Sequence, residues 1–265
     1  MDSPHCSACS LRQTAERNLI VIFIAAPFGN WIKHKNAISV TGTWTLEPRG
    51  NRLWSVLRTL RYDFKQKGWM NRLQLPNPGI VQGLEQTLGN EVLSIAEVNK
   101  NDFRKLIEII PESQSVELNL SCPNLGCKML PWDSAVVFAL YMGTVMEWCI
   151  AILFPLVTPE QLEYLIDDLG FTQLHFSNTL PWQGAGGLSG RVLRPYTLEL
   201  IRLVRENWGD SVTIIAGGGV KNWHDIYRYL SKGADHVSLG TVCFNPLALR
   251  KILRQQEGKE ENNEN

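Results

Sequence analysis

Residues 212–220 read Val-Thr-Ile-Ile-Ala-Gly-Gly-Gly-Val, and this stretch decides the fold. Its first five residues are apolar or β-branched, as expected for a strand that is buried on both faces of a parallel sheet. Three consecutive glycines then lead into a helical pattern that begins near Trp223. The order of strand, glycine turn and helix predicts a βα unit, with the turn at the carboxyl end of the strand.

Seven further runs of the same kind surround this unit, which gives eight predicted strands. They are Leu19–Ala25, Ala37–Val40, Val92–Ile95, Ser115–Leu120, Ile150–Phe154, Gln173–Ser177, Val212–Ala216 and His236–Leu239. Helical patterns fall between them or follow them at Asp102–Ile110, Ser134–Trp148, Pro159–Leu169, Tyr196–Trp208, Trp223–Ser231 and Pro246–Gln255. Eight strands with interleaved helices predict an α/β protein with a single-domain (β/α)8 TIM barrel. A doubly wound open sheet is the rival fold, but it requires a glycine-rich turn after the first strand, and here these turns come late.

The predicted barrel occupies residues 19–254, between a polar N-terminal tail (1–18) and a disordered polar tail (255–265). Within it, residues 41–88 are expected to form an elaborated loop region on the carboxyl face of the barrel, where active sites of this fold are built. The run from Ala135 to Val157 is long enough to span a membrane, but Pro155 and the polar flanks favour a buried helix followed by a buried strand.

Composition narrows the possible functions of the 265-residue chain. Hydrophobic residues make up 44%, which excludes disorder for most of the chain, and 26 Lys and Arg balance 26 Asp and Glu. A neutral chain lacks the basic surface that nucleic acids require, so no nucleic-acid partner is expected. Without an apolar leader, and with only six cysteines, the chain is expected in the reducing cytoplasm. Cys6 and Cys9 lack a second pair of ligands, so no metal site is predicted.

Two glycine turns predict a phosphate site. Gly217, Gly218 and Gly219 follow the seventh predicted strand, and Gly240 and Thr241 follow the eighth. Loops after these two strands commonly bind phosphate in TIM barrels, because glycine amides and the next helix N-terminus approach the anion closely. The alternative is a pair of tight turns with no ligand.

Amide and hydroxyl side chains gather at other predicted strand ends. Asn119, Cys122 and Asn124 close the fourth strand, Asn178 and Thr179 leave the sixth, and Asn71 lies in the long excursion. Such groups suit a planar, amide-rich anion, and a further loop at 184–191 could turn its backbone to a ligand. A cysteine at the barrel mouth can accept a proton if it ionises, while composition alone favours a buried structural cysteine.

Six motifs in this order resemble the dihydroorotate dehydrogenase family of FMN enzymes. They are Thr45–Arg49, Asn119–Asn124, Ser177–Thr179, Gly186–Gly190, Ala216–Val220 and Leu239–Thr241. The resemblance covers about residues 20–246. It implies an FMN barrel that oxidises dihydroorotate, a small-molecule substrate, to orotate in pyrimidine biosynthesis, and it implies a homodimer. The electron acceptor stays open among fumarate, NAD through an iron–sulfur partner, and quinone.

The resemblance also implies roles for individual residues. Cys122 stands where class 1 enzymes carry the base that removes the C5 proton while hydride passes from C6 to the flavin. The residues implied to hold the substrate are Asn71, Asn119, Asn124, Asn178 and Thr179. The residues implied to hold FMN are Gly187, Gly217, Gly218, Gly219, Gly240 and Thr241.

Two lysines that are usual in the family are absent. Gly42 stands three residues before Thr45, where a lysine usually contacts flavin and substrate, and Ile152 replaces a lysine near the end of the fifth strand. Losing two cations beside an anionic cofactor weakens its binding and lowers its potential. Two alternatives therefore stand beside the enzyme: a degenerate, non-catalytic barrel that binds a phosphate ligand or regulates a partner, and another phosphate-binding barrel enzyme without flavin.

Overall fold

The computed structural model describes residues 20–120, 132–141, 146–182 and 186–263. Eight parallel strands close into a barrel in the order β1-β12-β11-β8-β7-β6-β5-β2. They are β1 (Ile22–Ile24), β2 (Ile38–Trp44), β5 (Val92–Ile95), β6 (Val116–Asn119), β7 (Cys149–Leu153), β8 (Gln173–Phe176), β11 (Thr213–Ala216) and β12 (His236–Leu239). Each overlaps a predicted strand, and the TIM-barrel prediction is confirmed.

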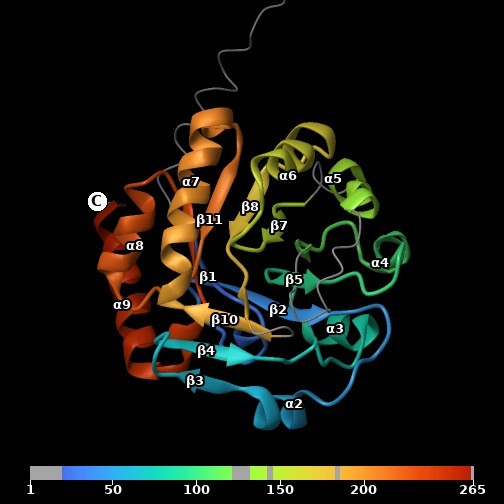
Figure 1. Cartoon of the computed structure of the whole chain (residues 1–265), viewed down its shortest axis with the longest axis horizontal. Helices are drawn as coiled ribbons and strands as arrows, with labels where there is room; N and C mark the ends of the chain where they lie inside the picture. Colours follow the sequence, from blue (N-terminus) through green and yellow to red (C-terminus); the bar gives the residue numbers. More distant parts are fainter. Residues whose placement is uncertain (1–19, 121–131, 142–145, 183–185, 264–265) are drawn as a thin grey trace, which may run out of the picture.

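Helices surround the barrel on both flanks (Figure 1). They are α2 (Arg52–Thr59), α3 (Ile80–Gln86), α4 (Asp102–Ile109), α5 (Val136–Tyr141), α6 (Pro159–Glu163), α7 (Arg194–Trp208), α8 (Trp223–Leu230) and α9 (Pro246–Asn263). Local sequence explains their starts. Thr158 and Gln161 form a capping box with Pro159 at the first position of α6, and Asn222 accepts from the Asp225 amide at 3.2 Å to begin α8.

Alternation along the strands separates two buried layers. The outward-facing residues pack against the helices in one large cluster. Inside the barrel lies a second buried cluster, made of Phe23, Val40, Val92, Trp148, Ile150 and Ile215. The rings of Phe23 and Trp148 meet edge to face at 5.0 Å, which plugs the amino end of the barrel with aromatic carbon.

The excursion at 41–88 is more ordered than its sequence predicts. Besides α2 and α3 it carries β3 (Arg61–Asp63) and β4 (Gly68–Asn71), and these pair with β9 (Leu180–Trp182) and β10 (Gly186–Gly190) in an antiparallel sheet ordered β3-β4-β10-β9. This small sheet runs beside α2 at the lower edge of Figure 1. The expected loop region therefore contains helices and strands that its sequence did not predict. The sheet is formed by segments more than 100 residues apart, and no local pattern encodes that pairing.

Two helix boundaries also differ from prediction. The helix predicted over 134–148 is a 3-10 turn at Trp132–Ala135 followed by α5, and Trp148 instead enters the barrel interior ahead of β7. The helix predicted to end at Gln255 continues to Asn263, through the start of the stretch expected to be disordered, because Gln, Glu and Lys are good helix formers. Residues 1–18 lie outside the described ranges.

Candidate functional site at the barrel mouth

The glycine loop after β11 turns its three carbonyl groups toward α7 and α8. Gly217 O accepts from the Thr197 hydroxyl at 3.1 Å, Gly218 O accepts from the Tyr229 hydroxyl at 2.6 Å, and Gly219 O accepts from Arg194 Nε at 3.1 Å. Burial raises the pKa of Tyr229, so its hydroxyl stays protonated and able to donate. Three helix side chains thus fix the loop from behind.

The amide groups of the same loop are left for another acceptor. Gly218 and Gly219 have φ of +92° and +71°, a conformation that side chains rarely adopt. Their N–H groups donate to no other residue within the described ranges. Successive amides held in this way form a concavity that binds anions. The loop therefore has the chemistry of an oxyanion site.

A buried ion pair holds this loop in place. The Arg194 guanidinium is 2.5 Å from the Asp225 carboxylate, and both side chains are about nine-tenths buried. The other Asp225 oxygen accepts from the Lys221 amide at 2.9 Å, directly after the loop. Burial lowers the pKa of Arg194, an effect that Asp225 opposes. The pair joins the first turn of α7 to the start of α8.

The second glycine turn lies beside the first. Gly240 and Thr241 follow β12, the parallel neighbour of β11, and begin the 3-10 helix η7 (Thr241–Phe244). A Cβ atom at Gly240 would meet no atom within 4 Å, so this turn borders open space. The two turns predicted to bind phosphate therefore lie on adjacent strands at one end of the barrel.

Polar side chains cross the same end of the barrel. The Asn178 side-chain amide donates to Asn119 Oδ1 at 3.0 Å, and Asn119 Nδ2 donates to Thr43 Oγ1 at 3.5 Å. Thr43 in turn shares a 3.1 Å hydrogen bond with Ser94. The network joins the ends of β2, β5 and β6 to the second residue after β8. Of the predicted substrate residues, Asn119 and Asn178 are in direct contact.

Thr179 and Asn71 reach the mouth through the small sheet. The Thr179 hydroxyl oxygen is buried and has no partner among the described residues. A Cβ at Gly187 would lie 2.1 Å from that oxygen, so glycine is required there by the approach of Thr179. Gly187 also pairs with Asn71 across β10 and β4. Cys122 and Asn124, predicted for the same site, lie outside the described residues.

A buried pair of ionisable side chains inside the barrel is absent from the sequence predictions. His175 Nδ1 and Glu117 Oε2 are 2.7 Å apart, and both side chains are buried. Glu117 and His175 are each an ionisable residue within an apolar predicted strand, and this is the sequence pattern that could have identified them. Their pairing across β7 could not be read from the sequence, because it depends on the curvature of the barrel.

The two positions that lack the family's lysines are both closed by apolar or backbone atoms. At Gly42, where φ is +106°, a Cβ would lie 2.5 Å from the Ser94 carbonyl oxygen. Ile152 is 9% exposed and in register with Asn119 on one side and His175 on the other. Neither position supplies a positive charge to the mouth.

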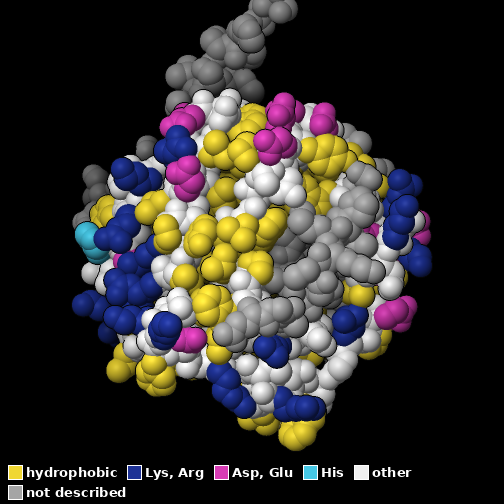
Figure 2. Space-filling model, viewed as in Figure 1, with side chains coloured by type: hydrophobic (Ala, Val, Ile, Leu, Met, Phe, Trp, Pro, Cys, Tyr) yellow, Lys and Arg dark blue, Asp and Glu magenta, His cyan; other side chains and the backbone are white. Residues whose placement is uncertain are grey.

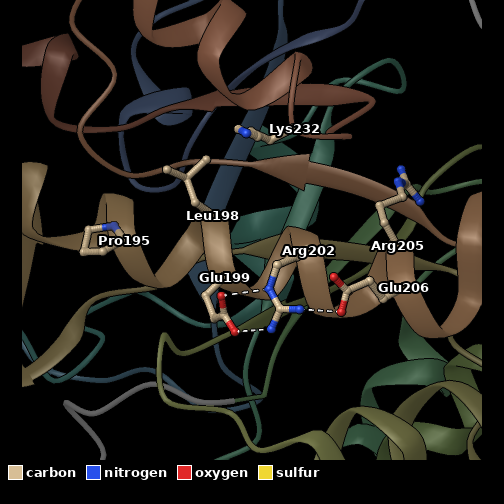
Figure 3. Close-up of a pocket in the computed structure, with 7 residues that line it drawn as sticks. All are labelled: Pro195, Leu198, Glu199, Arg202, Arg205, Glu206 and Lys232. Atoms are coloured by element: carbon tan, nitrogen blue, oxygen red, sulfur yellow. Dashed lines mark hydrogen bonds and ion pairs between the residues drawn. The ribbon is translucent and has the colours of Figure 1, made fainter.

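A shallow hollow on α7 is a poor alternative site. It lies on the outer surface of the barrel, between Pro195 and Lys232 (Figure 3). Its Arg202 is held by Glu199, with Nε at 3.1 Å from the carboxylate, and also by Glu206. On the face drawn in Figure 2, Lys and Arg side chains gather on the side where α8 and α9 lie, and others line the bottom and right edges.

The described ranges contain no candidate metal centre and no candidate membrane-spanning helix. No group of three or more His, Cys, Asp and Glu side chains there could hold a metal ion. No described helix is both long enough and apolar enough to cross a bilayer.

Comparisons with known proteins point to one family. The family model described as "Dihydroorotate dehydrogenase" matches residues 168–257. "Dihydroorotate dehydrogenase B (NAD(+)), catalytic subunit" of Halalkalibacterium halodurans is 26% identical over 247 residues, which cover 80% of this chain and 77% of that protein. The protein of the same name from Listeria monocytogenes serotype 4b is 28% identical over 243 residues, with the same coverage.

Solved structures agree on the fold. The structure of DHODH from Eimeria tenella in complex with ferulenol superposes with a TM-score of 0.67 at 19% identity, covering 89% of this chain and 80% of that one. The ligand-free type DHODH from the same organism gives a TM-score of 0.63.

Proposed function

We propose that the chain is a member of the dihydroorotate dehydrogenase family, which it resembles in sequence, and that it oxidises dihydroorotate to orotate with FMN bound at the barrel mouth. The observation that carries the proposal is the glycine loop at 217–219. Its carbonyls are tied back by Thr197, Tyr229 and Arg194, and two of its amides are left to face an anion. That arrangement fits the phosphate of FMN.

The surroundings of the loop fit the same group. The open space at Gly240 and the backbone amides of the turn at Thr241 would complete the phosphate site. Gly187, which lies close to the Thr179 hydroxyl, would line the cofactor. When bound, FMN supplies the hydride acceptor for C6 of the substrate. The chain supplies the remaining work of binding, orientation and proton removal.

The substrate side of the proposal rests on the polar network. Asn119 and Asn178 already bond each other, and further amide donors and acceptors at Asn71 and Asn124 would hold the ring and carboxylate of dihydroorotate. The buried, unpartnered Thr179 hydroxyl would gain a partner when substrate binds, which offsets the cost of burying it. Cys122 would take the C5 proton as a thiolate and later release it to solvent.

Electron flow beyond the flavin calls for a second component. The bacterial relatives are named as NAD(+)-linked catalytic subunits, which implies at least one other subunit in those proteins. We infer NAD(+) as the final acceptor here, reached through a partner chain and not through direct contact with the substrate.

FMN binding by the purified protein tests the proposal. Added FMN should raise the thermal unfolding temperature, as any ligand of the native state alone must do. Gly240→Glu should abolish that rise, because it places a carboxylate in open space beside the phosphate without displacing other atoms. Gly89→Glu is the matched control, since a Cβ there also meets nothing within 4 Å, far from the mouth. A wild-type protein whose stability ignores FMN would favour the non-catalytic barrel instead.

A further inference from the structure

Large apolar side chains face solvent along α2 and the hairpin formed by β3 and β4. The exposed fraction is 84% for Phe64, 62% for Trp54 and 59% for Leu57. Trp54, Leu57 and Arg58 are spaced three and four residues apart, so they share the outer face of α2. A helix on the surface of a globular protein usually turns its apolar side chains toward the core. The outward direction of these side chains therefore calls for an explanation.

The helix and the hairpin form one continuous surface. The ring centroid of Tyr62 lies 5.1 Å from that of Phe64 and 5.3 Å from that of Trp69, in edge-to-face contact with both. The Arg61 guanidinium donates to the Leu57 carbonyl at 3.1 Å, which ties β3 to α2. Both elements lie at the lower edge of Figure 1. We refer to the exposed side chains of residues 54–67 as the hairpin surface.

Basic side chains alternate with the apolar ones on the hairpin surface. Its four exposed cations are Arg58, Arg61, Lys65 and Lys67. Its one acidic residue, Asp63, is half-buried and accepts from the Gln66 amide at 2.9 Å. Arg58, Lys65 and Lys67 have no acidic partner among the residues that the structure describes. Lys and Arg stand beside hydrophobic side chains at the lower edge of Figure 2. Since the whole chain has no net charge, this positive charge is a local feature.

Two kinds of partner fit the hairpin surface poorly. An isologous dimer would bring the same patch of each copy together, so the unpaired cations would face one another and repel. Protein interfaces have a contiguous apolar core and are depleted in lysine, whereas here cations separate the apolar side chains. Aromatic rings interleaved with Lys and Arg are instead typical of proteins that lie on anionic bilayers, where rings enter the headgroup region and cations meet lipid phosphates.

We propose that the hairpin surface binds the surface of bilayers that contain anionic phospholipids. Trp54, Leu57 and Phe64 enter the headgroup region, and the surrounding cations contact the lipid phosphates. Binding of this kind is peripheral and reversible, and it needs no helix that crosses the bilayer. The inference goes beyond the proposed function, because none of these side chains belongs to the glycine turns or to the polar network at the barrel mouth.

Co-sedimentation of the full chain with lipid vesicles tests the proposal. One set of vesicles contains phosphatidylcholine alone, and the other contains equal parts of phosphatidylcholine and phosphatidylglycerol. The wild type should bind the mixed vesicles, and added salt should release it. Lys65→Gln/Lys67→Gln should weaken that binding by about fivefold for each charge removed. Phe64→Ser should weaken it by about tenfold, because it removes the most exposed apolar side chain of the surface.

Two control variants make the same changes elsewhere. Lys100→Gln/Lys105→Gln removes two exposed charges outside the hairpin surface. Leu88→Ser removes a side chain that is 62% exposed in the connection leading into β5, at the opposite end of the barrel. Both should bind mixed vesicles as the wild type does, and thermal unfolding checks that every variant is folded.

Several results would overturn the proposal. They are a wild type that does not bind the mixed vesicles, equal binding to phosphatidylcholine alone, and control variants that lose as much binding as the hairpin variants. Binding of soluble polyglutamate without binding of vesicles would assign the hairpin surface to an acidic protein instead. A wild-type dimer in sedimentation equilibrium that Phe64→Ser dissociates would assign it to a second copy of the chain.

Discussion

The side-chain amide of Asn178 donates to the side-chain oxygen of Asn119 at 3.0 Å, joining the second residue after β8 to the end of β6. The Asn178 backbone amide also donates to the Leu153 carbonyl at 2.7 Å, and its Oδ1 accepts from the Thr179 amide at 2.8 Å. Asn178 is thereby fixed on three sides, and it holds Asn119 in one orientation. The two asparagines form a preorganised amide surface.

Asn119→Ala should weaken the binding of dihydroorotate and leave the affinity for FMN unchanged. Removal of one hydrogen bond to a bound polar ligand, with its partner left unsatisfied, costs about 1–3 kcal/mol, or about five- to 150-fold in affinity. Flavin reduction by limiting dihydroorotate, followed anaerobically by stopped flow, should slow by that factor. Asn207→Ala, on the outer side of α7, is the control and should match wild type. A parallel loss of FMN affinity in Asn119→Ala would contradict this division of roles.

Arg194→Leu should destabilise the protein and loosen the glycine loop. The substitution leaves Asp225 buried without its cation, and breaking a buried pair on one side costs about 3–5 kcal/mol. At about 2–4 °C per kcal/mol for a chain of this size, the unfolding temperature should fall by about 10 °C. Added FMN should raise the unfolding temperature of Arg194→Leu by less than it raises that of the wild type, because the Gly219 carbonyl has lost its hydrogen bond from Arg194.

Arg202→Leu, eight residues further along the same helix α7, is a matched control in a more exposed environment. Arg202 is half exposed and pairs with two glutamates on the solvent side. Ion pairs of this kind contribute little in water, so its unfolding temperature should stay near the wild-type value. Equal losses for Arg194→Leu and Arg202→Leu would show that the buried pair has no special role.

The barrel strands could be predicted from sequence because each is a short local run with a distinctive composition. Val92–Ile95 and His236–Leu239 match the predicted bounds residue for residue. The four strands of the small sheet could not be predicted, since β4 meets β10 only after the barrel has brought them together. A hydrophobic pattern among neighbouring residues does not show which distant strand a segment pairs with.

The candidate site likewise contains residues that a local sequence pattern predicts and residues that only the folded structure brings together. The glycine turns at Gly217 and Gly240 were visible because glycines after a strand are a local pattern. The anchors behind them, such as Tyr229, were not visible, because their partners are carbonyl groups and any residue has one. The Glu117–His175 pair combines both difficulties: its residue types are suggestive, but only the closed barrel makes them neighbours.

His236 should make the protein less stable in acid. Its Nδ1 accepts from the Val21 amide at 3.2 Å, and its ring packs on Trp148 at 5.4 Å. Burial lowers the pKa of His236, with Asp235 opposing that shift, so the unfolded chain binds the proton more readily than the folded one. Stability should therefore fall as pH drops through about 6.5, the value for a free histidine, and level off below the folded pKa.

Thermal unfolding at pH 7.5 and pH 5.5 measures that effect. His236→Asn keeps an acceptor near the Val21 amide but cannot titrate, so it should lose less stability between the two pH values than wild type does. His224→Asn, on the exposed face of α8, should behave as wild type. An acid loss of the same size in His236→Asn would assign the effect to other groups.

Cys122 is the residue on which proton removal depends in the proposed mechanism. A general base contributes about 10²–10⁴-fold to such a step. Cys122→Ala should slow flavin reduction by dihydroorotate by that factor and leave the FMN-induced rise in unfolding temperature unchanged. Cys122→Ser should recover part of the rate at high pH, where the harder-to-form alkoxide becomes accessible. Anaerobic stopped-flow bleaching of the flavin measures each rate.

The remaining cysteines make this test clean. Burial raises the pKa of Cys149 and of Cys243 to about 12, so neither thiol competes as a base near neutral pH. Cys127→Ala, five residues from Cys122, is the control and should reduce flavin at the wild-type rate. If Cys122→Ala bleaches as fast as wild type, Cys122 is not the base. If Cys127→Ala is the slower variant, the base has been assigned to the wrong cysteine, and the class 1 resemblance at Asn119–Asn124 has to be realigned.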